Sequence, residues 1–301
     1  MSLIECVPNV SEGRRPQVIR ACADAITAAG ATLLDQTSDP DHNRSVFTFA
    51  GSEGVVRAAV HALVDVALGT IDLRTHSGVH PRMGAVDVIP FVPLGGTSLD
   101  ACVRIAREMG AELAERHDLP IFLYEAAASA PHRRGLEHVR RGQFEGLAAK
   151  LLGPEWAPDF GPAAPHPSGG ATAVGARHPL IAFNVNLATD RLEVAKAVAA
   201  AVRESSGGLP CVKALGLPLA VRGVVQVSMN LTNFRTTSME RAFVAVRDAA
   251  KGFGVEVLES EVIGLVPAEA LASAGASAIR LPAFRPDMLL EVRLLSRPAI
   301  R

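Results

Sequence analysis

The stretch S-V-F-T-F-A-G-S-E-G-V-V-R-A-A-V-H-A-L-V-D-V-A-L, from Ser45 to Leu68, decides the fold of the first half of the chain. It joins a strand pattern, Ser45–Ala50, to a helix pattern, Glu53–Leu68. Outward from this pair, the same periodicities predict strand Leu3–Val7, helix Pro16–Ala29, strand Ala31–Asp35 and strand Ala85–Val92. The predicted order of elements is therefore β-α-β-β-α-β.

Helix Pro16–Ala29 has apolar residues at helical spacing, among them Val18, Cys22 and Ile26. Ser11 precedes it as a polar candidate for the N-cap.

The C-terminal half repeats this order of elements. The predicted elements are strand Leu180–Leu187, helix Arg191–Glu204, strands Cys211–Leu215 and Val224–Leu231, helix Ser238–Phe253 and strand Val255–Glu259. Two β-α-β-β-α-β units are typical of ferredoxin-like folds, in which helices cover one face of each sheet. The sequence thus predicts an α+β protein with two ferredoxin-like (βαββαβ) subdomains.

Additional material separates the two predicted units. Helix Leu99–Arg116, strand Pro120–Tyr124 and short helices within Leu136–Leu152 are expected to be ordered. The stretch Gly153–Gly170 is too rich in proline and glycine for regular structure. Because it contains the only tryptophan of the chain as well as Phe160, we expect an ordered loop lining a cleft in preference to a simple linker.

Composition excludes several classes of protein. The chain has 301 residues, of which 49% are hydrophobic, and a formal net charge of −1. A nucleic-acid surface needs clustered basic residues, whereas the pairs Arg133-Arg134 and Arg140-Arg141 are short and are expected to be solvated. The N-terminal residues lack the basic segment of a signal peptide, and no apolar run is long enough to span a membrane. Four scattered cysteines without C-x-x-C spacing indicate buried thiols and a cytoplasmic location.

The richest chemistry lies in T-H-S-G-V-H-P-R-M-G-A-V-D, from Thr75 to Asp87. Histidine is suited to proton transfer near neutral pH, and rigid polar loops commonly carry catalytic side chains. Two alternatives stay open at this point. His76 and His80 could be structural, or they could bind a metal with Asp72 or Asp87. The metal hypothesis is weakened because Ser77-Gly78 and Pro81 interrupt any helix that would give their spacing a geometric meaning.

Two further groups of polar residues are candidates. The loop Thr37–Arg44, T-S-D-P-D-H-N-R, is either a solvated turn or the source of an acid that assists a histidine. Asparagines occur at strand ends, namely Asn9, Asn184, Asn186, Asn230 and Asn233. They are either satisfied within the sheets or form a polar lining that binds a heterocycle or a carboxylate.

Common catalytic motifs are missing from the sequence. It has no phosphate-binding G-x-x-x-x-G-K-[ST] loop and no G-x-S-x-G elbow, and Gly169–Ala176 has the wrong glycine spacing for dinucleotide binding. Nucleotide hydrolysis, serine-hydrolase chemistry and hydride transfer are therefore disfavoured.

Long motifs resemble the glutamate formimidoyltransferase family, the transferase part of formimidoyltransferase-cyclodeaminase. The matching stretches are Glu5–Gly13 (E-C-V-P-N-V-S-E-G), Asp41–Thr48 (D-H-N-R-S-V-F-T), His76–Val88 (H-S-G-V-H-P-R-M-G-A-V-D-V), Trp156–Pro162 (W-A-P-D-F-G-P), Gly170–Arg177 (G-A-T-A-V-G-A-R), Ala182–Leu187 (A-F-N-V-N-L) and Ser260–Pro267 (S-E-V-I-G-L-V-P). The resemblance spans almost the whole chain.

The resemblance implies an enzyme that transfers a formimidoyl group from N-formimidoyl-L-glutamate to N5 of tetrahydrofolate, in histidine degradation. N-formyl-glutamate is a possible alternative donor. It also implies a cytoplasmic homodimer without a metal, in which tetrahydrofolate is the acceptor substrate. The implied domains are residues 1–177 and 178–301, with their sheets facing each other across a substrate tunnel.

By the same resemblance, His80 is the catalytic histidine, assisted by Asp39 or, alternatively, by Asp41. The implied folate-binding segment consists of Ala163, Ala164, Pro165, His166, Pro167, Ser168, Gly169, Gly170, Ala171 and Thr172. Both substrates carry glutamate carboxylates, for which arginine is a suitable bidentate partner. The candidate substrate contacts are Asn9, Arg44, Arg82, Arg177, Asn184 and Asn186.

Two other functions remain as alternatives. One is a folate- or ligand-binding homologue without turnover, and the other is a metal-dependent amidohydrolase.

Overall fold

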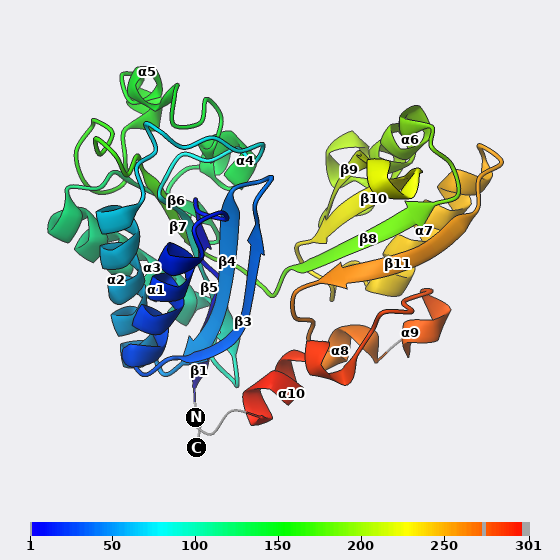
Figure 1. The fold of residues 1–301 in the computed structure, drawn as a ribbon, viewed down its shortest axis with the longest axis horizontal. Helices are drawn as coiled ribbons and strands as arrows, with labels where there is room; N and C mark the ends of the chain where they lie inside the picture. The colour runs from blue at the N-terminus through cyan, green and yellow to red at the C-terminus, as the bar shows by residue number, and fades with distance from the viewer. Residues whose placement is uncertain (1, 273–274, 297–301) are drawn as a thin grey trace. The chain divides into compact units, whose positions relative to one another are not determined.

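The computed structural model describes residues 2–272 and 275–296, which divide into two compact units. The first unit ends at Arg177 and the second runs from His178 to Ser296. Each unit has its own sheet (Figure 1). Each also has its own hydrophobic core. The last residues of the predicted second domain, 297–301, lie outside the described residues.

The first unit contains the predicted β-α-β-β-α-β order, with element ends shifted by a few residues. Its elements are β1 (Leu3–Cys6), β2 (Asn9–Val10), α1 (Pro16–Ala28), β3 (Thr32–Asp39), β4 (Arg44–Gly51), α2 (Glu53–Thr70), β5 (Val86–Leu94), α3 (Leu99–His117), β6 (Ile121–Glu125), the 3₁₀ turn η1 (Pro131–Arg133), α4 (Leu136–Val139), α5 (Leu147–Lys150), η2 (Pro154–Trp156) and β7 (Thr172–Ala176).

In the first sheet, β1 and β2 follow one another in a single strand position. Each pairs antiparallel with β4 on one side and β5 on the other. Pro8 falls between them, where its missing N–H cannot join the ladder. β3 pairs with β4 at one edge. At the other edge, β7 lies between β5 and β6 and is parallel to both. The strand order is thus β3-β4-(β1, β2)-β5-β7-β6.

Strand β7 was missed by the sequence analysis, which rejected Gly169–Ala176 as a dinucleotide-binding motif and predicted no strand there. All five residues of this strand, T-A-V-G-A, are buried. A Cβ at Gly175 would lie 2.6 Å from ring atoms of Tyr124 on the neighbouring strand. Position 175 therefore requires glycine. A strand that contains glycine and alanine lacks the β-branched and aromatic residues by which strands are recognised in a sequence.

Both faces of the β5–β7–β6 region are covered. Helices α1, α2 and α3 pack on one face of the first sheet (Figure 1). On the opposite face, a smaller cluster includes Phe122, Tyr124, Leu147 and Trp156. The Lys150 Nζ lies 3.7 Å from the centre of the Trp156 ring. The proline- and glycine-rich stretch is therefore ordered as predicted, and its tryptophan packs on the sheet.

The predicted N-cap at Ser11 was wrong. The hydroxyl of Ser11 donates to the carbonyl of Gly84 at 2.7 Å. No side chain caps α1 at its N-cap, Arg15; just before the helix, Oε1 of Glu12 accepts the backbone N–H groups of Arg14 at 2.8 Å and Arg15 at 2.9 Å. A buried carboxylate at a helix N-terminus interacts favourably with the helix dipole.

The second unit again contains the predicted order of elements. Its elements are β8 (Ile181–Leu187), α6 (Leu192–Val202), η3 (Glu204–Ser206), β9 (Val212–Leu219), η4 (Ala220–Arg222), β10 (Val224–Leu231), α7 (Met239–Lys251), β11 (Val257–Ile263), α8 (Ala268–Leu271), α9 (Gly275–Ala278), η5 (Pro286–Met288) and α10 (Leu290–Leu295). The sheet is fully antiparallel, with the order β11-β8-β10-β9. Helices α6 and α7 pack on its Phe183 and Val185 face, so Asn184 and Asn186 lie on the other face.

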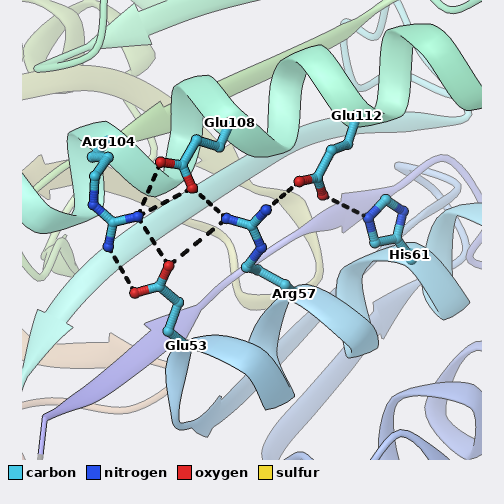
Figure 2. A network of polar contacts seen from close by, with 6 residues as sticks. All are labelled: Glu53, Arg57, His61, Arg104, Glu108 and Glu112. Carbon is cyan, nitrogen blue, oxygen red and sulfur yellow. Dashed lines mark hydrogen bonds and ion pairs between the residues drawn. The ribbon is translucent and has the colours of Figure 1, made fainter.

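A network of charged side chains joins α2 to α3 (Figure 2). Arg57 on α2 contacts Glu112 and, at 2.5 Å, Glu108 on α3. Arg104 on α3 contacts Glu53 on α2 at 2.7 Å. Because the side chain of Arg57 is only 23% exposed, this network is screened less than an isolated surface pair.

We expect Arg57→Gln to lower the free energy of unfolding by about 1 kcal/mol, and by less at high salt. Urea denaturation at low and high ionic strength measures both effects. Arg20→Gln, at an exposed position of α1, is the matched control and should change stability by less than about 0.5 kcal/mol. Equal losses in the two variants would contradict a stabilising role for the network.

Candidate active site

The loop between α2 and β5, residues 71–85, is here called the His80 loop. Its two ends are bonded to one turn of the folate segment predicted from the sequence. The Leu73 N–H donates to Ser168 at 2.9 Å, the Ala85 N–H donates to Gly169 at 2.9 Å, and the Ala171 N–H donates to Met83 at 3.0 Å. The structure thus brings two regions that are distant in the sequence into direct backbone contact.

Two glycines make this contact possible. Gly84 and Gly170 form an isolated antiparallel β-bridge. A Cβ at Gly170 would lie 2.0 Å from the carbonyl oxygen of Met83. A Cβ at Gly84 would lie 2.1 Å from the carbonyl oxygen of Ala171. Gly170 also has a φ of +71°, which favours glycine. The predicted folate segment and the His80 loop are therefore packed backbone to backbone.

Asp87 fixes the C-terminal end of the His80 loop. Its side chain is 2% exposed, and its Oδ1 accepts the Met83 N–H at 2.8 Å. Its Oδ2 accepts from Nε of Arg140 at 2.7 Å. The prediction of two solvated arginine pairs was therefore wrong for one member of each, because Arg133 is also buried and pairs with Asp159 at 2.9 Å. A basic dipeptide in the sequence gives no sign that one side chain turns inward.

His76 and Arg82 hold the His80 loop in place. The His76 Nε2–H donates to the Asn43 carbonyl at 3.0 Å, and its Nδ1 accepts from Nε of Arg82 at 3.1 Å. Arg82 is 6% exposed and binds both oxygens of Glu145, at 2.7 and 2.8 Å. Further bonds reach Gln143 and the His76 carbonyl, so all the N–H donors of Arg82 are engaged. This geometry favours a positioning role for Arg82 over the substrate contact predicted from the sequence.

His80 has a different environment from His76. The Nη1 of Arg44 lies 2.8 Å from Nε2 of His80. Because a guanidinium can only donate, Nε2 must carry the lone pair, and the neutral ring carries its proton on Nδ1. Burial, and then the charges of Arg44 and Arg140, lower the pKa of His80 to about 3. His80 is therefore a neutral imidazole at physiological pH.

Arg44 begins β4 and belongs to the face of the sheet opposite Phe47 and Phe49, which pack on the helices. Its Nε is buried without a hydrogen-bond partner. Among the residues that the structure describes, no carboxylate forms an ion pair with it. Burial, followed by the charge of Arg140, lowers its pKa. An unpaired, partly buried guanidinium is suited to binding an anion.

Asp39 contacts His42, which lies between this acid and His80. The Oδ1 of Asp39 accepts the N–H groups of Asp41 and His42 at 2.9 Å each, and its Oδ2 lies 2.7 Å from Nδ1 of His42. The rings of His42 and His80 are 6.3 Å apart in an edge-on arrangement. Although burial alone would raise it, hydrogen bonds from His42 hold the pKa of Asp39 below its usual value.

The predicted folate segment consists of an exposed part and a buried part. Ala163, Ala164 and Pro167 are exposed, and Pro165, His166 and Ser168 are half-buried. Gly169, Gly170, Ala171 and Thr172 are buried. Reciprocal backbone bonds between His166 and Gly170, at 2.9 and 3.0 Å, close the turn. The turn thus presents its residues before Gly169 to solvent, while its end continues into β7.

Asn9 lies within the first sheet, and Arg177 directly follows its strand β7. Asn9 on β2 pairs with Val46, two residues from Arg44 along β4, and its side chain bonds the Val7 carbonyl at 3.4 Å. Arg177 is half-buried, and its N–H donates to the Phe91 carbonyl at 3.1 Å.

Asn184 and Asn186 are satisfied within the second unit. Asn184 donates to Glu261 and Asn186 donates to Glu259, each at 3.1 Å. Gln226, which the sequence analysis missed, donates to Asn186 at 2.9 Å and to Glu261 at 2.7 Å. The alternation of Gln226, Ser228 and Asn230 with apolar residues in β10 was the available signal.

Within residues 2–272 and 275–296, no group of three or more His, Cys, Asp or Glu side chains is arranged to hold a metal ion. Both ring nitrogens of His76 are also used by the protein, which leaves no lone pair for a metal. No described helix is long and apolar enough to cross a membrane.

Comparisons with known proteins cover both units. A family model described as the N-terminal subdomain of the formiminotransferase domain matches residues 3–177, and one described as the formiminotransferase domain matches residues 182–281. A glutamate formimidoyltransferase of Streptococcus pyogenes serotype M1 is 47% identical over 89% of this chain and 90% of its own length.

Another glutamate formimidoyltransferase, from Thermoplasma acidophilum, is 43% identical over 98% of each chain. A formimidoyltransferase-cyclodeaminase of Sus scrofa is 44% identical over 91% of this chain, which spans 52% of that relative. The chain therefore belongs to the formiminotransferase family and is an enzyme of the transferase class.

Proposed function

We propose that this enzyme transfers a formimidoyl group from N-formimidoyl-L-glutamate to N5 of tetrahydrofolate, giving 5-formimidoyltetrahydrofolate and glutamate, in histidine degradation. N-formyl-glutamate is a second candidate donor, because it differs only in carrying oxygen in place of NH. The observation that carries the proposal is the juxtaposition of neutral His80 with Arg44, whose guanidinium has no carboxylate partner. The names of the relatives support the same reaction.

His80 acts as base and then as acid in the proposed reaction. N5 of the folate attacks the amidine carbon, and His80 accepts the N5 proton at Nε2. When the bond from that carbon to the glutamate nitrogen breaks, His80 returns the proton to the leaving nitrogen. A protonated amidine is already electrophilic, so the reaction needs no metal and no covalent intermediate.

Arg44 is the proposed partner of a substrate carboxylate, because no described carboxylate forms an ion pair with it. Asn9 and Arg177 are proposed as additional polar contacts on the family resemblance. The exposed residues of 163–168 are proposed to hold the folate, and the buried residues 169–172 fix that turn against the His80 loop. Arg82 has a positioning role here, and Asn184 and Asn186 would contact substrate only if their bonds within the sheet opened.

We further propose that both units are ferredoxin-like subdomains, residues 1–177 and 178–301, whose sheets face each other across a substrate tunnel. The strand orders β3-β4-(β1, β2)-β5 and β9-β10-β8-β11 support the ferredoxin-like part of this proposal, because the two units share one topology. The tunnel rests on the family resemblance. A cytoplasmic homodimer is part of the same proposal and rests on the family resemblance.

A two-donor assay tests this function. Purified enzyme with tetrahydrofolate and N-formimidoyl-L-glutamate is expected to form 5-substituted folate and glutamate in equal amounts, and a chelator should leave the rate unchanged. The same assay with N-formyl-L-glutamate measures donor preference. Release of formamide or formate without folate would identify an amidohydrolase, and thermal stabilisation by tetrahydrofolate without turnover would identify a binding protein.

Asp39 is the proposed assisting acid, in preference to Asp41. In Asp39→Asn the amide oxygen can still accept the backbone N–H groups of Asp41 and His42, but the carboxylate contact to the His42 ring is lost. We therefore expect a fall in turnover of about 10- to 100-fold. Asp41→Asn removes an exposed carboxylate and should cost less than about threefold. Steady-state kinetics of both variants measure the difference. A larger loss in Asp41→Asn would reverse the assignment.

The Asp39 contact should hold throughout the neutral pH range. Because the pKa of Asp39 is depressed in the folded protein, its stabilising bond to His42 is present above the unfolded pKa of about 3.9. It is lost as the pH falls through the lower, folded pKa.

A further inference from the structure

We infer that Arg44 gates the catalytic base. In the unliganded enzyme its guanidinium occupies the proton-accepting nitrogen of His80, and a substrate carboxylate frees this nitrogen by taking the guanidinium for itself. The inference rests on the proposed function of His80. It adds a positioning role for Arg44 to its role as an anion ligand.

The geometry leaves His80 unable to act as a base in the unliganded state. Nε2 of His80 lies 2.8 Å from Nη1 of Arg44, and that nitrogen carries the only basic lone pair of the neutral ring. A proton from N5 of the folate would have to enter the position already held by a guanidinium N–H. The contact must therefore open before proton transfer begins.

The guanidinium of Arg44 is incompletely hydrogen-bonded in this position. Its buried Nε has no partner, and the Asp87 carboxylate, which could have paired with it, is engaged with Arg140 at 2.7 Å. A carboxylate binds a guanidinium through two parallel N–H···O bonds, whereas an imidazole nitrogen provides one neutral acceptor. It is therefore favourable for Arg44 to exchange its hydrogen bond to His80 for bonds to a substrate carboxylate. The carboxylate also gives the buried Nε of Arg44 a hydrogen-bond partner.

The groups that face His80 come from three elements. Arg44 belongs to β4, Arg140 follows α4, and His42 and Asp39 lie at the β3–β4 turn. Besides burial, the charges of Arg44, Arg140 and His42 lower the pKa of His80, in that order, and the charge of Asp39 raises it. Moving Arg44 onto an anion reduces the first of these charge effects. The base thus gains strength when the donor or the folate has bound.

NMR of histidine labelled with ¹⁵N tests the gate directly. In unliganded wild type we expect His80 to be neutral with its proton on Nδ1 across pH 5 to 8. N-acetyl-L-glutamate, which has two carboxylates and no transferable group, should release Nε2 and raise the pKa of His80, because the charge of Arg44 is then paired with the probe. The gate is wrong if saturating probe leaves the His80 signals unchanged, or if Nε2 of His80 already carries the proton in unliganded wild type.

The variant Arg44→Gln provides a second test of the gate. In this variant the pKa of His80 should be higher than in wild type without the probe, because the charge of Arg44 is removed while burial remains. Its kcat/KM should then fall more steeply than that of wild type as the pH is lowered from 8 to 5, because the pH dependence of kcat/KM follows ionisations of the free enzyme. Arg74→Gln is the matched control, since Arg74 is exposed in the same loop and pairs locally with Asp72. A carboxylate ligand without a gating role would raise KM in Arg44→Gln and leave the pH profile as in wild type.

His80→Gln separates the two hypotheses. If this variant is inactive while the probe leaves the His80 signals of wild type unchanged, the proposed function stands and the gate is wrong. If His80→Gln retains turnover, the proposed function fails whatever the NMR result.

Discussion

His80→Ala is expected to lower turnover by about 10²- to 10⁴-fold while the protein remains folded. His80 is half-buried at the surface of its loop, and its side chain bonds to Arg44. It has none of the backbone contacts by which His76 holds the loop. Removing it therefore deletes the proposed proton carrier and leaves the anchors of the loop, Arg82 and Asp87, in place.

The control for this variant is another histidine of the same unit. His138 is exposed on α4, and His138→Gln should keep wild-type turnover within about twofold. Initial rates with saturating tetrahydrofolate, together with a thermal melt, distinguish a catalytic loss from unfolding. Near-normal turnover by folded His80→Ala would remove His80 from the mechanism.

Gly170→Ala is expected to lower the free energy of unfolding by about 2 to 5 kcal/mol. The new methyl group would lie 2.0 Å from the carbonyl oxygen of Met83, and the backbone has a φ of +71° at this position. The turn can accept the methyl group only by moving away from the His80 loop. Turnover should therefore fall at temperatures at which the variant is still folded.

Gly69→Ala is the matched control for this glycine. Gly69 lies in α2, and a Cβ there would meet no atom within 4 Å. The substitution should raise stability, by up to about 1 kcal/mol, because alanine favours a helix. Denaturation curves of the two variants test the pair. A Gly170→Ala protein as stable as wild type would contradict close packing of the turn on the loop.

The sequence predicted most elements of the fold because their periodicities are strong. Helix α2 and strand β4 carry the apolar patterns of 3.6 and 2 residues that periodicity detects. Strand β7 was missed for the opposite reason. It is buried on both faces between β5 and β6 and is built from small residues, so it has neither alternation nor bulk.

The sequence identified residues of the candidate site but did not predict most of the contacts between them. The His80 loop and the Thr37–Arg44 loop were both singled out, and the structure brings them together through Arg44 and His80. Nothing in the sequence indicates that Asp39 contacts His42, or that Arg140 turns inward to Asp87. Such pairings depend on the tertiary arrangement of side chains, which local patterns do not encode.

The place of β7 in the sheet bears on how the first unit is assembled during synthesis. β7 is the last strand of its unit to leave the ribosome, yet it lies between two strands made earlier, β5 and β6. Until Thr172–Ala176 emerges, both neighbours expose unpaired edges, which favour wrong pairing and aggregation. Completion of the sheet therefore waits for the strand that directly follows the turn bonded to the His80 loop, so the last strand and this turn are placed at the same step.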